Sequence, residues 1–138
     1  MNPQKVSLNK LAKRWNPYRE TVWVKIKKPI TREEVTAVLA EGNIKPKRVR
    51  KYLIWDISTC REHLVRIAWL VRHWKDKYPL EIDVGCQGSS GFVVCDGNHR
   101  LAAAMYLRKR WVWANMSGDC EWIKEYLWKG SSKCKSTS

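Results

Sequence analysis

Residues 92–105 restrict the possible folds of this chain more than any other part of the sequence. A short apolar run ends at Cys95, and a polar turn over residues 96–98 separates it from an alanine-rich run over residues 101–105. Glycine within the turn permits a tight reversal, asparagine caps helices well, and alanines allow a helix to pack closely. The segment therefore predicts a strand, a glycine turn and a helix capped by Asn98.

Two capping boxes predict two further helices. Thr31 lies three residues before Glu34, and Thr59 lies three residues before Glu62. At this spacing each side chain can form a hydrogen bond with the backbone N–H of the other residue. Apolar residues then recur every three or four positions, which predicts helices over residues 32–41 and 59–77. Runs of β-branched and aromatic residues predict five strands, at residues 22–27, 49–57, 80–84, 92–95 and 111–116. A last amphipathic pattern predicts a helix at residues 122–127.

These elements predict an α/β fold of mixed α+β type, with a small mixed sheet and about four helices. We expect a basic strand-helix extension over residues 1–49 and a core that includes the C-terminal helix over residues 50–129. Residues 130–138 lack apolar periodicity and predict a flexible tail.

The chain is strongly basic, which makes nucleic acid the first expected partner. It holds 27 Lys+Arg against 13 Asp+Glu, and the resulting net charge of +14 exceeds what solubility needs. The densest basic stretch predicts contacts with a nucleic-acid backbone; its members are Lys45, Lys47, Arg48, Arg50 and Lys51. The alternative is a solvated strand edge, where lysines discourage aggregation.

The first turn of the helix that follows Gly97 is a candidate phosphate site. Free N–H groups at a helix N-terminus carry the positive end of the helix dipole, and glycine lets a ligand approach the backbone. His99 and Arg100 add donors, and a guanidinium can bridge two phosphate oxygens. Gly97, Asn98, His99 and Arg100 are therefore the expected phosphate-binding residues. On spacing alone, a plain connecting turn explains the pattern as well.

Three residues of this segment are candidates for catalysis: Asp96, His99 and Arg100. A histidine can donate to a phosphate or transfer a proton near neutral pH. Asp96 can hold Mg²⁺ or orient His99, although a turn-capping aspartate explains it equally well. Asp83 is a weaker metal candidate, and a solvent-facing role is favoured for it. His63 can face the segment, but an isolated helical histidine is more often packed or solvated.

The run DGNHRLAAA, residues 96–104, resembles the phosphate-binding box of the ParB/sulfiredoxin superfamily. The expected order of strands and helices is similar to that superfamily over about residues 50–117. The resemblance implies a ParB/sulfiredoxin-like fold in which residues 97–100 cradle the phosphates of ATP or CTP together with a divalent ion such as Mg²⁺.

The sequence departs from two branches of the superfamily. Sulfiredoxins carry a catalytic cysteine just before the His-Arg pair, where this chain has Asn98, so reduction of sulfinic acids is not expected. ParB partition proteins continue into further domains, for which the 22 residues after Met116 leave no room. The segment is more similar to free-standing members, which include a small-molecule serine kinase and plasmid and phage proteins linked to nucleotide hydrolysis or DNA cleavage.

The cysteines and the apolar runs indicate the cellular compartment of the protein. The five cysteines form no Cys-x-x-Cys pair and no zinc-finger spacing with histidine, so we expect reduced thiols. No apolar run matches a membrane span, and the first residues lack the apolar core of a signal peptide. We expect a soluble cytoplasmic protein without a membrane partner.

Several of the nine tryptophans fall on patterns typical of a protein core. Stacking of tryptophan rings on nucleic-acid bases is therefore the minority interpretation, unless Trp15, Trp23 or Trp128 is exposed.

The sequence leaves three functions open. The leading hypothesis is a ParB-like protein that binds nucleotide or DNA phosphates, with hydrolysis of nucleotide or nucleic acid as a further step. The second is a small-molecule kinase or ATPase of the same fold. The third is a non-enzymatic interaction protein, for example an inhibitor of a host nucleic-acid enzyme.

Overall fold

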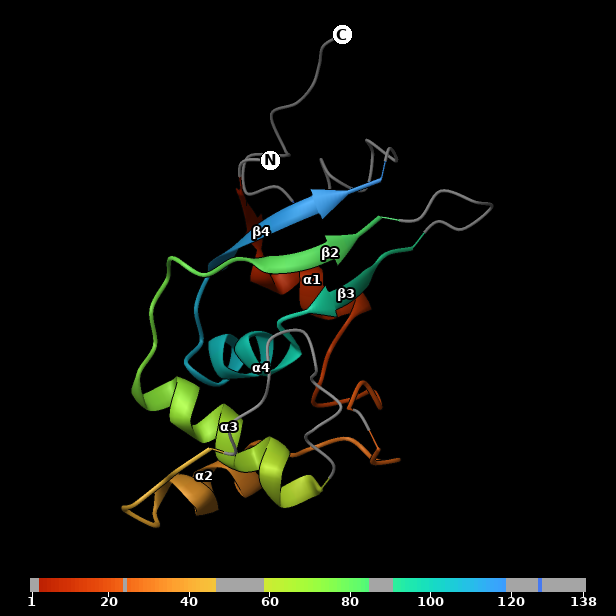
Figure 1. The fold of residues 1–138 in the computed structure, drawn as a ribbon. Coiled ribbons are helices and arrows are strands. Elements are labelled where there is room, and N and C mark those ends of the chain that lie inside the picture. The colour runs from red at the N-terminus through yellow and green to blue at the C-terminus, as the bar shows by residue number, and fades with distance from the viewer. Residues whose placement is uncertain (1–2, 24, 47–58, 85–90, 119–126, 128–138) are drawn as a thin grey trace, which may run out of the picture. The chain divides into compact units, whose positions relative to one another are not determined.

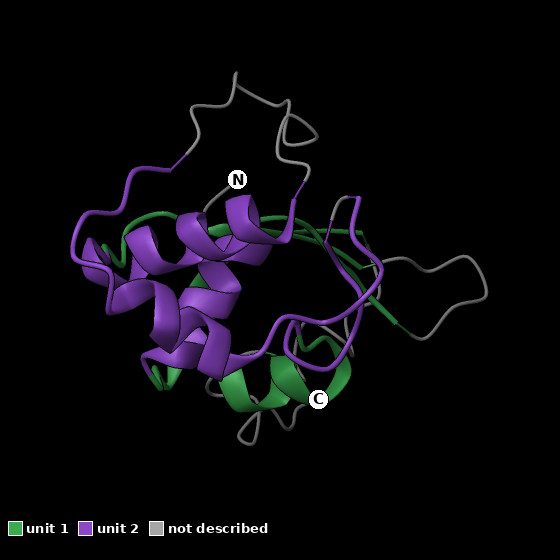
Figure 2. Ribbon diagram, turned by 90° about the horizontal axis from the view of Figure 1, so that it is seen from below, with its two compact units in different colours: residues 1–16, 75–97, 108–138 green, residues 17–74, 98–107 purple. Residues whose placement is uncertain are grey.

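The computed structural model describes residues 3–23, 25–46, 59–84, 91–118 and 127. The chain divides into two compact units, each built from separate stretches of sequence (Figure 2). Unit 1 comprises residues 1–16, 75–97 and 108–138, and unit 2 comprises residues 17–74 and 98–107. The expected boundaries at residues 49 and 129 both lie outside the described residues.

Unit 1 is a four-stranded mixed sheet (Figure 1). Its strands are β1 (Gln4–Ser7), β2 (Leu80–Asp83), β3 (Val93–Asp96) and β4 (Trp111–Ser117), in the spatial order β1-β4-β2-β3. β4 pairs antiparallel with β1 and parallel with β2, and β2 pairs antiparallel with β3. Along β2 and β4 buried apolar residues alternate with more exposed residues, as in a sheet with one covered face.

A short helix, α1 (Leu8–Arg14), follows β1 directly. The Ser7 hydroxyl accepts a hydrogen bond from the backbone N–H of Lys10, which caps the helix. The Leu8 N–H donates to the carbonyl of Arg110 at 2.9 Å, and the Leu8 and Leu11 side chains are buried. The sequence patterns did not indicate β1 or α1.

Unit 2 contains three helices: α2 (Arg32–Leu39), α3 (Cys60–Arg72) and α4 (Asn98–Tyr106). Both capping boxes are formed, because Thr31 and Thr59 each accept from the N–H three residues later and Glu34 and Glu62 bond back. α3 packs against both α2 and α4. The side chains at the centre of this unit are fully buried; they include Ile30, Val35, Ile67, Ala68, Ala102 and Ala103.

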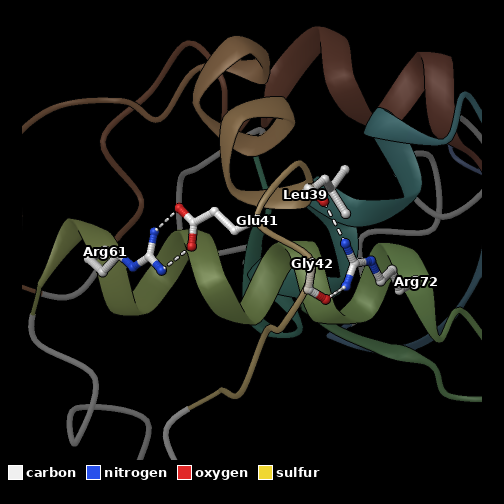
Figure 3. A network of polar contacts seen from close by, with 5 residues as sticks. All are labelled: Leu39, Glu41, Gly42, Arg61 and Arg72. Atoms are coloured by element: carbon white, nitrogen blue, oxygen red, sulfur yellow. Dashed lines mark hydrogen bonds and ion pairs between the residues drawn. The ribbon is translucent and has the colours of Figure 1, made fainter.

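Two arginines of α3 hold the C-terminal end of α2 (Figure 3). Arg72 donates to the carbonyl oxygens of Leu39 and Gly42, two backbone acceptors just where the α2 helix ends. Arg61 forms a two-pronged ion pair with Glu41. The guanidinium of Arg61 holds the pKa of the Glu41 carboxyl below its usual value.

α4 is tied to Tyr18, which precedes α2, and to Arg32, the first residue of α2. The Tyr18 hydroxyl donates to the carbonyl of Ala102 at 2.8 Å, and Arg32 donates to the carbonyl of Met105 at 2.9 Å. Burial of Tyr18, opposed by the charge of Arg32, raises the pKa of its hydroxyl. The Tyr18 hydroxyl is therefore a fixed hydrogen-bond donor.

The mixed α/β class is confirmed, since the described residues form four helices and a four-stranded mixed sheet. The strand expected at residues 22–27 is wrong for the described positions, because Lys25 has φ +66° and the segment carries no strand pairing. α3 ends at Arg72 rather than near residue 77. The His73 ring donates to the Trp69 carbonyl and stacks on the Trp69 ring, and its backbone leaves the helical region.

Two expected elements lie mostly outside the described residues. The strand expected at residues 49–57 lies wholly outside them. The helix expected at residues 122–127 lies outside them except for Leu127, which is helical and fully buried. None of the helices in the described part of the chain is long and apolar enough to cross a membrane.

Candidate functional site

The first turn of α4 carries most of the residues expected to bind phosphate. Gly97 adopts φ +103°, a conformation that other residues rarely take, and α4 begins directly after it at Asn98. The expectation that Asn98 caps the helix is therefore wrong: Asn98 is the first helical residue, and the permissive backbone of Gly97 makes the turn. Asn98 and Arg100 are partly exposed, whereas His99 is buried with 4% of its surface accessible.

His99 is paired with His63 of α3. Nδ1 of His63 lies 2.8 Å from Nε2 of His99, and the ring planes are nearly parallel, with centroids 5.1 Å apart. His63 has no accessible surface. A hydrogen bond between two imidazoles requires one ring to donate and the other to accept, so the pair is fully matched when both rings are neutral. His63, which sequence reasoning admitted only as able to face this segment, is thus a partner of His99.

The ring of Trp23 packs against both imidazoles of this pair. Its ring centroid lies 5.2 Å from that of His63 and 5.0 Å from that of His99, at tilted angles. Its indole N–H donates to the carbonyl of Pro17 at 3.3 Å. Trp23 retains 4% of its surface, so this ring is buried and does not offer a platform for base stacking.

Burial dominates the electrostatics of His99. It holds the pKa of the ring well below the ordinary value of 6.5, and the charges of His63, Arg66 and Arg100 act in the same direction. His99 is therefore a neutral hydrogen-bonding group at physiological pH. The expectation that His99 contacts phosphate or transfers a proton stays a prediction; any such role would use a neutral ring within the helix interface.

Arg66 is a residue that sequence reasoning missed. Its guanidinium acts on His99 from α3, and that of Arg100 acts from the first turns of α4. The signal was available in the spacing, because Arg66 follows His63 by three residues and so lies on the same side of α3. Trp23 gave no comparable signal, since its pattern indicated a strand.

The residues expected to hold a metal belong to unit 1. Asp96 is exposed at the end of β3, and a bulge at Cys95 places Asp96 opposite Glu81 of β2. Asp83 accepts a hydrogen bond from the Ser117 hydroxyl at 3.3 Å, which supports a structural, solvent-facing role. Within the described stretches, no group of three or more His, Cys, Asp or Glu side chains is placed to hold a metal ion.

The Cys95 thiol lies beside these carboxylates. Desolvation raises the pKa of the thiol, and the charge of Asp83 adds to the increase. A thiol in such a setting carries little thiolate at neutral pH and is a poor nucleophile. Cys60 and Cys95, the two cysteines in the described ranges, are both free.

The basic stretch is described only at its first residue. Lys45 is exposed, and Lys47, Arg48, Arg50 and Lys51 lie outside the described residues. Lys45 borders a pocket of about 370 Å³ whose other lining residues are Asn43, Ile44, Arg61, Glu62 and Val65. The cation of Arg61 is already bound to Glu41.

Comparison with known proteins leaves the site to be interpreted from its chemistry. No protein-family model matches the chain, and no curated protein and no solved structure is similar to it at a significant level.

Proposed function

We propose that this chain binds phosphate groups of nucleic acid and that the first turn of α4 supplies the principal contact. The observation that carries the proposal is the geometry of this turn: α4 begins directly after Gly97, whose φ is +103°, and Asn98 and Arg100 are partly exposed there. A phosphate suits the forked donors of arginine and the N–H groups of the helix start.

The charge of the whole chain supports nucleic acid over an isolated anion as the ligand. A net charge of +14 attracts a polyanion and releases its counterions on binding. Lys45 and the basic residues that follow it would then contact the backbone without reading bases. The residues at the start of α4 would fix one phosphate within that wider contact.

Nucleotide binding is the extension that the ParB/sulfiredoxin resemblance suggests. In that case residues 97–100 would hold the phosphates of ATP or CTP, and Asp96 would be the candidate ligand for Mg²⁺. Hydrolysis of nucleotide or nucleic acid would engage Asp96, His99 and Arg100. A neutral His99 would serve there as a hydrogen-bonding partner, because burial opposes its positive form.

Replacing arginines tests the phosphate site directly. Arg100→Ala and Arg66→Ala should each weaken binding of a labelled oligonucleotide by about tenfold or more, because each removes a charge-assisted hydrogen bond. Arg19→Ala is the matched control: Arg19 is an exposed arginine of the same unit outside α3 and α4. Fluorescence anisotropy with single-stranded and duplex probes gives the affinities. If Arg100→Ala and Arg19→Ala bind equally well, the site assignment is wrong.

Salt dependence tests the basic stretch. For about five phosphate contacts, the logarithm of affinity should fall with the logarithm of salt concentration at about −0.9 per contact. Replacing both Arg48 and Arg50 by alanine should flatten that slope by about two and weaken all sequences alike. No binding to either probe at about 50 mM salt would remove nucleic acid from the expected partners.

Thermal unfolding with nucleotides separates the extension from the main proposal. A ligand of the folded state raises the unfolding temperature by mass action. ATP and CTP, each with and without Mg²⁺, should raise it for the parent chain and not for Arg100→Ala. If oligonucleotides bind and no nucleotide shifts the transition, the chain is a nucleic-acid binder without a nucleotide site.

A further inference from the structure

Two tryptophans lie on the side of β4 that faces away from the core of unit 1. Trp111 and Trp113 alternate with the buried Val112 and Ala114, and both tryptophans are partly exposed. Residues two positions apart on a strand point to the same side of the sheet, so the two indoles are neighbours. We call this side of the sheet the open face. Tryptophan is enriched at interaction surfaces, because its ring offers a large rigid area for contact.

Lys5 of β1 brings a positive charge to these two rings. It is opposite Trp113 in the β1–β4 ladder, and residues that are opposite each other in a ladder share one side of the sheet. Nζ of Lys5 lies 3.2 Å from the ring centroid of Trp111 and 5.5 Å from that of Trp113. An ammonium is attracted to the face of an indole, so Trp111 holds the Lys5 cation in place beside Trp113.

The acidic residues of β2 lie farther along the open face. Glu81 is opposite Asn115 of β4 and accepts a hydrogen bond from its Nδ2 at 2.9 Å. Asp83 is opposite Ser117 and accepts a hydrogen bond from its hydroxyl at 3.3 Å. The exposed Arg110 instead directly precedes β4. A polyanion is therefore attracted to the tryptophan end of the open face and repelled from its acidic end.

An indole beside a fixed cation suits one nucleotide of an unpaired strand. Every base has a flat face that can stack on an aromatic ring, and the phosphate next to that base can accept a hydrogen bond from an ammonium. Bases within a duplex are already stacked on their neighbours. A duplex therefore offers this surface its phosphates alone.

We propose that the tryptophan end of the open face binds single-stranded nucleic acid, with a base stacked on Trp113 and an adjacent phosphate bound by Lys5. This inference names the form of nucleic acid that the chain binds, and it rests on the proposed function. Trp111 supports the ammonium, and Trp113 receives the base. All three residues belong to unit 1, whereas the α4 turn belongs to unit 2, so substitutions can address the two sites separately.

Two oligonucleotides that differ only in their bases test the stacking. One is an oligothymidylate of about 12 nucleotides, and the other is an abasic strand with the same number of phosphates and the same dye. Fluorescence anisotropy should show that the parent chain binds the oligothymidylate about 5- to 150-fold more tightly. Equal affinities would overturn the stacking and leave phosphate binding in place. Absence of binding to both strands at about 50 mM salt would overturn the proposed function together with this inference.

Substitutions locate the preference for bases. Trp113→Leu keeps an apolar side chain without a ring and should abolish the preference, whereas Trp113→Phe should keep most of it. Trp69→Leu is the matched control, because Trp69 is a partly exposed tryptophan of unit 2. Lys5→Gln should weaken binding of both strands by the same factor, and an unchanged affinity would overturn its phosphate contact. A preference that survives Trp113→Leu would overturn the site.

Arg100→Ala distinguishes the open face from the α4 turn. This variant should bind both strands more weakly by the same factor and keep the preference for bases, because Arg100 belongs to the other unit. If Arg100→Ala binds as tightly as the parent while Trp113→Leu loses the preference, the α4 turn is not the principal contact and the open-face site stands.

Photocrosslinking tests the site in the parent chain, even if the variants at Trp113 fail to fold. A strand that contains 5-iodouracil crosslinks to aromatic side chains in stacking contact, and mass spectrometry identifies the attached peptide. The crosslink should map to residues 111–113, and a crosslink confined to other peptides would overturn the site. A second copy of this chain is the competing occupant of the open face. A dimer that excludes the oligothymidylate and dissociates on Trp113→Leu would overturn the proposal as well.

Discussion

Gly118 should not tolerate replacement, because its backbone leaves no room for a side chain. A Cβ atom at this position would lie 1.9 Å from the carbonyl oxygen of Val84, and φ is +100°. Real Cβ contacts are essentially never shorter than 3.0 Å, so the Val84 carbonyl would have to retreat by about 1.1 Å. The N–H of the same residue donates to the carbonyl of Ser117 at 2.8 Å, so the shift strains a bond that extends the β2–β4 pairing.

The expected destabilisation of Gly118→Ala has two parts. A positive φ costs an alanine about 1–2 kcal/mol, and weakening the hydrogen bond between Val84 and Ser117 costs about 0.5–1.5 kcal/mol. Together they predict a loss of about 2.5 kcal/mol. Gly42→Ala is the matched control, because φ there is +66° and nothing lies within 4 Å of the added Cβ. Gly42→Ala should lose only the backbone cost, about 1 kcal/mol.

Urea unfolding followed by circular dichroism and tryptophan fluorescence measures the difference. With a denaturant slope of about 2 kcal/mol per molar urea, Gly118→Ala should unfold about 0.75 M earlier than Gly42→Ala. The slope itself should not change, which would show that the folded state rather than the unfolded ensemble is affected. Equal midpoints for the two variants would refute the steric reasoning.

Three further substitutions probe unit 2 by urea unfolding. Tyr18→Phe should cost about 1 kcal/mol, because the carbonyl of Ala102 loses its tyrosine donor; an unchanged midpoint would mean that water replaces it without loss. Thr59→Ala should cost about 1 kcal/mol by removing the N-cap of α3, and Thr59→Ser should restore most of that stability. Ile67→Ala should cost about 2–5 kcal/mol because the side chain is fully buried, and a loss below about 1 kcal/mol would contradict its place in the core.

Local signals were sufficient for the helices of unit 2 and for three of the strands. The capping residues Thr31 and Thr59 mark helix starts through bonds that span only three residues, and these bonds form as expected. The glycine turn placed the start of α4 within one residue. In each case the determining interaction lies within a few positions along the chain, so the sequence pattern contains it.

Interactions between distant residues account for what was missed. β1 is a four-residue strand with a single fully buried side chain, Val6, and its pairing partner is β4 near the other end of the chain. Trp23 was expected in a strand, but its ring packs against two imidazoles from two different helices. The burial of His99 likewise depends on a residue 36 positions away, which no local pattern records.

The pairing of β1 with β4 sets an order of events during synthesis. β1 lies beside β4 (Figure 1), and Gln4 is opposite Ala114, so β1 pairs with a strand made 110 residues later. At about 5–20 residues per second, β1 waits on the order of ten seconds for its partner. The α2–α3 packing joins neighbouring segments and requires no such wait. We therefore expect α2 and α3 to gain protection from proteolysis on stalled nascent chains before β1 does.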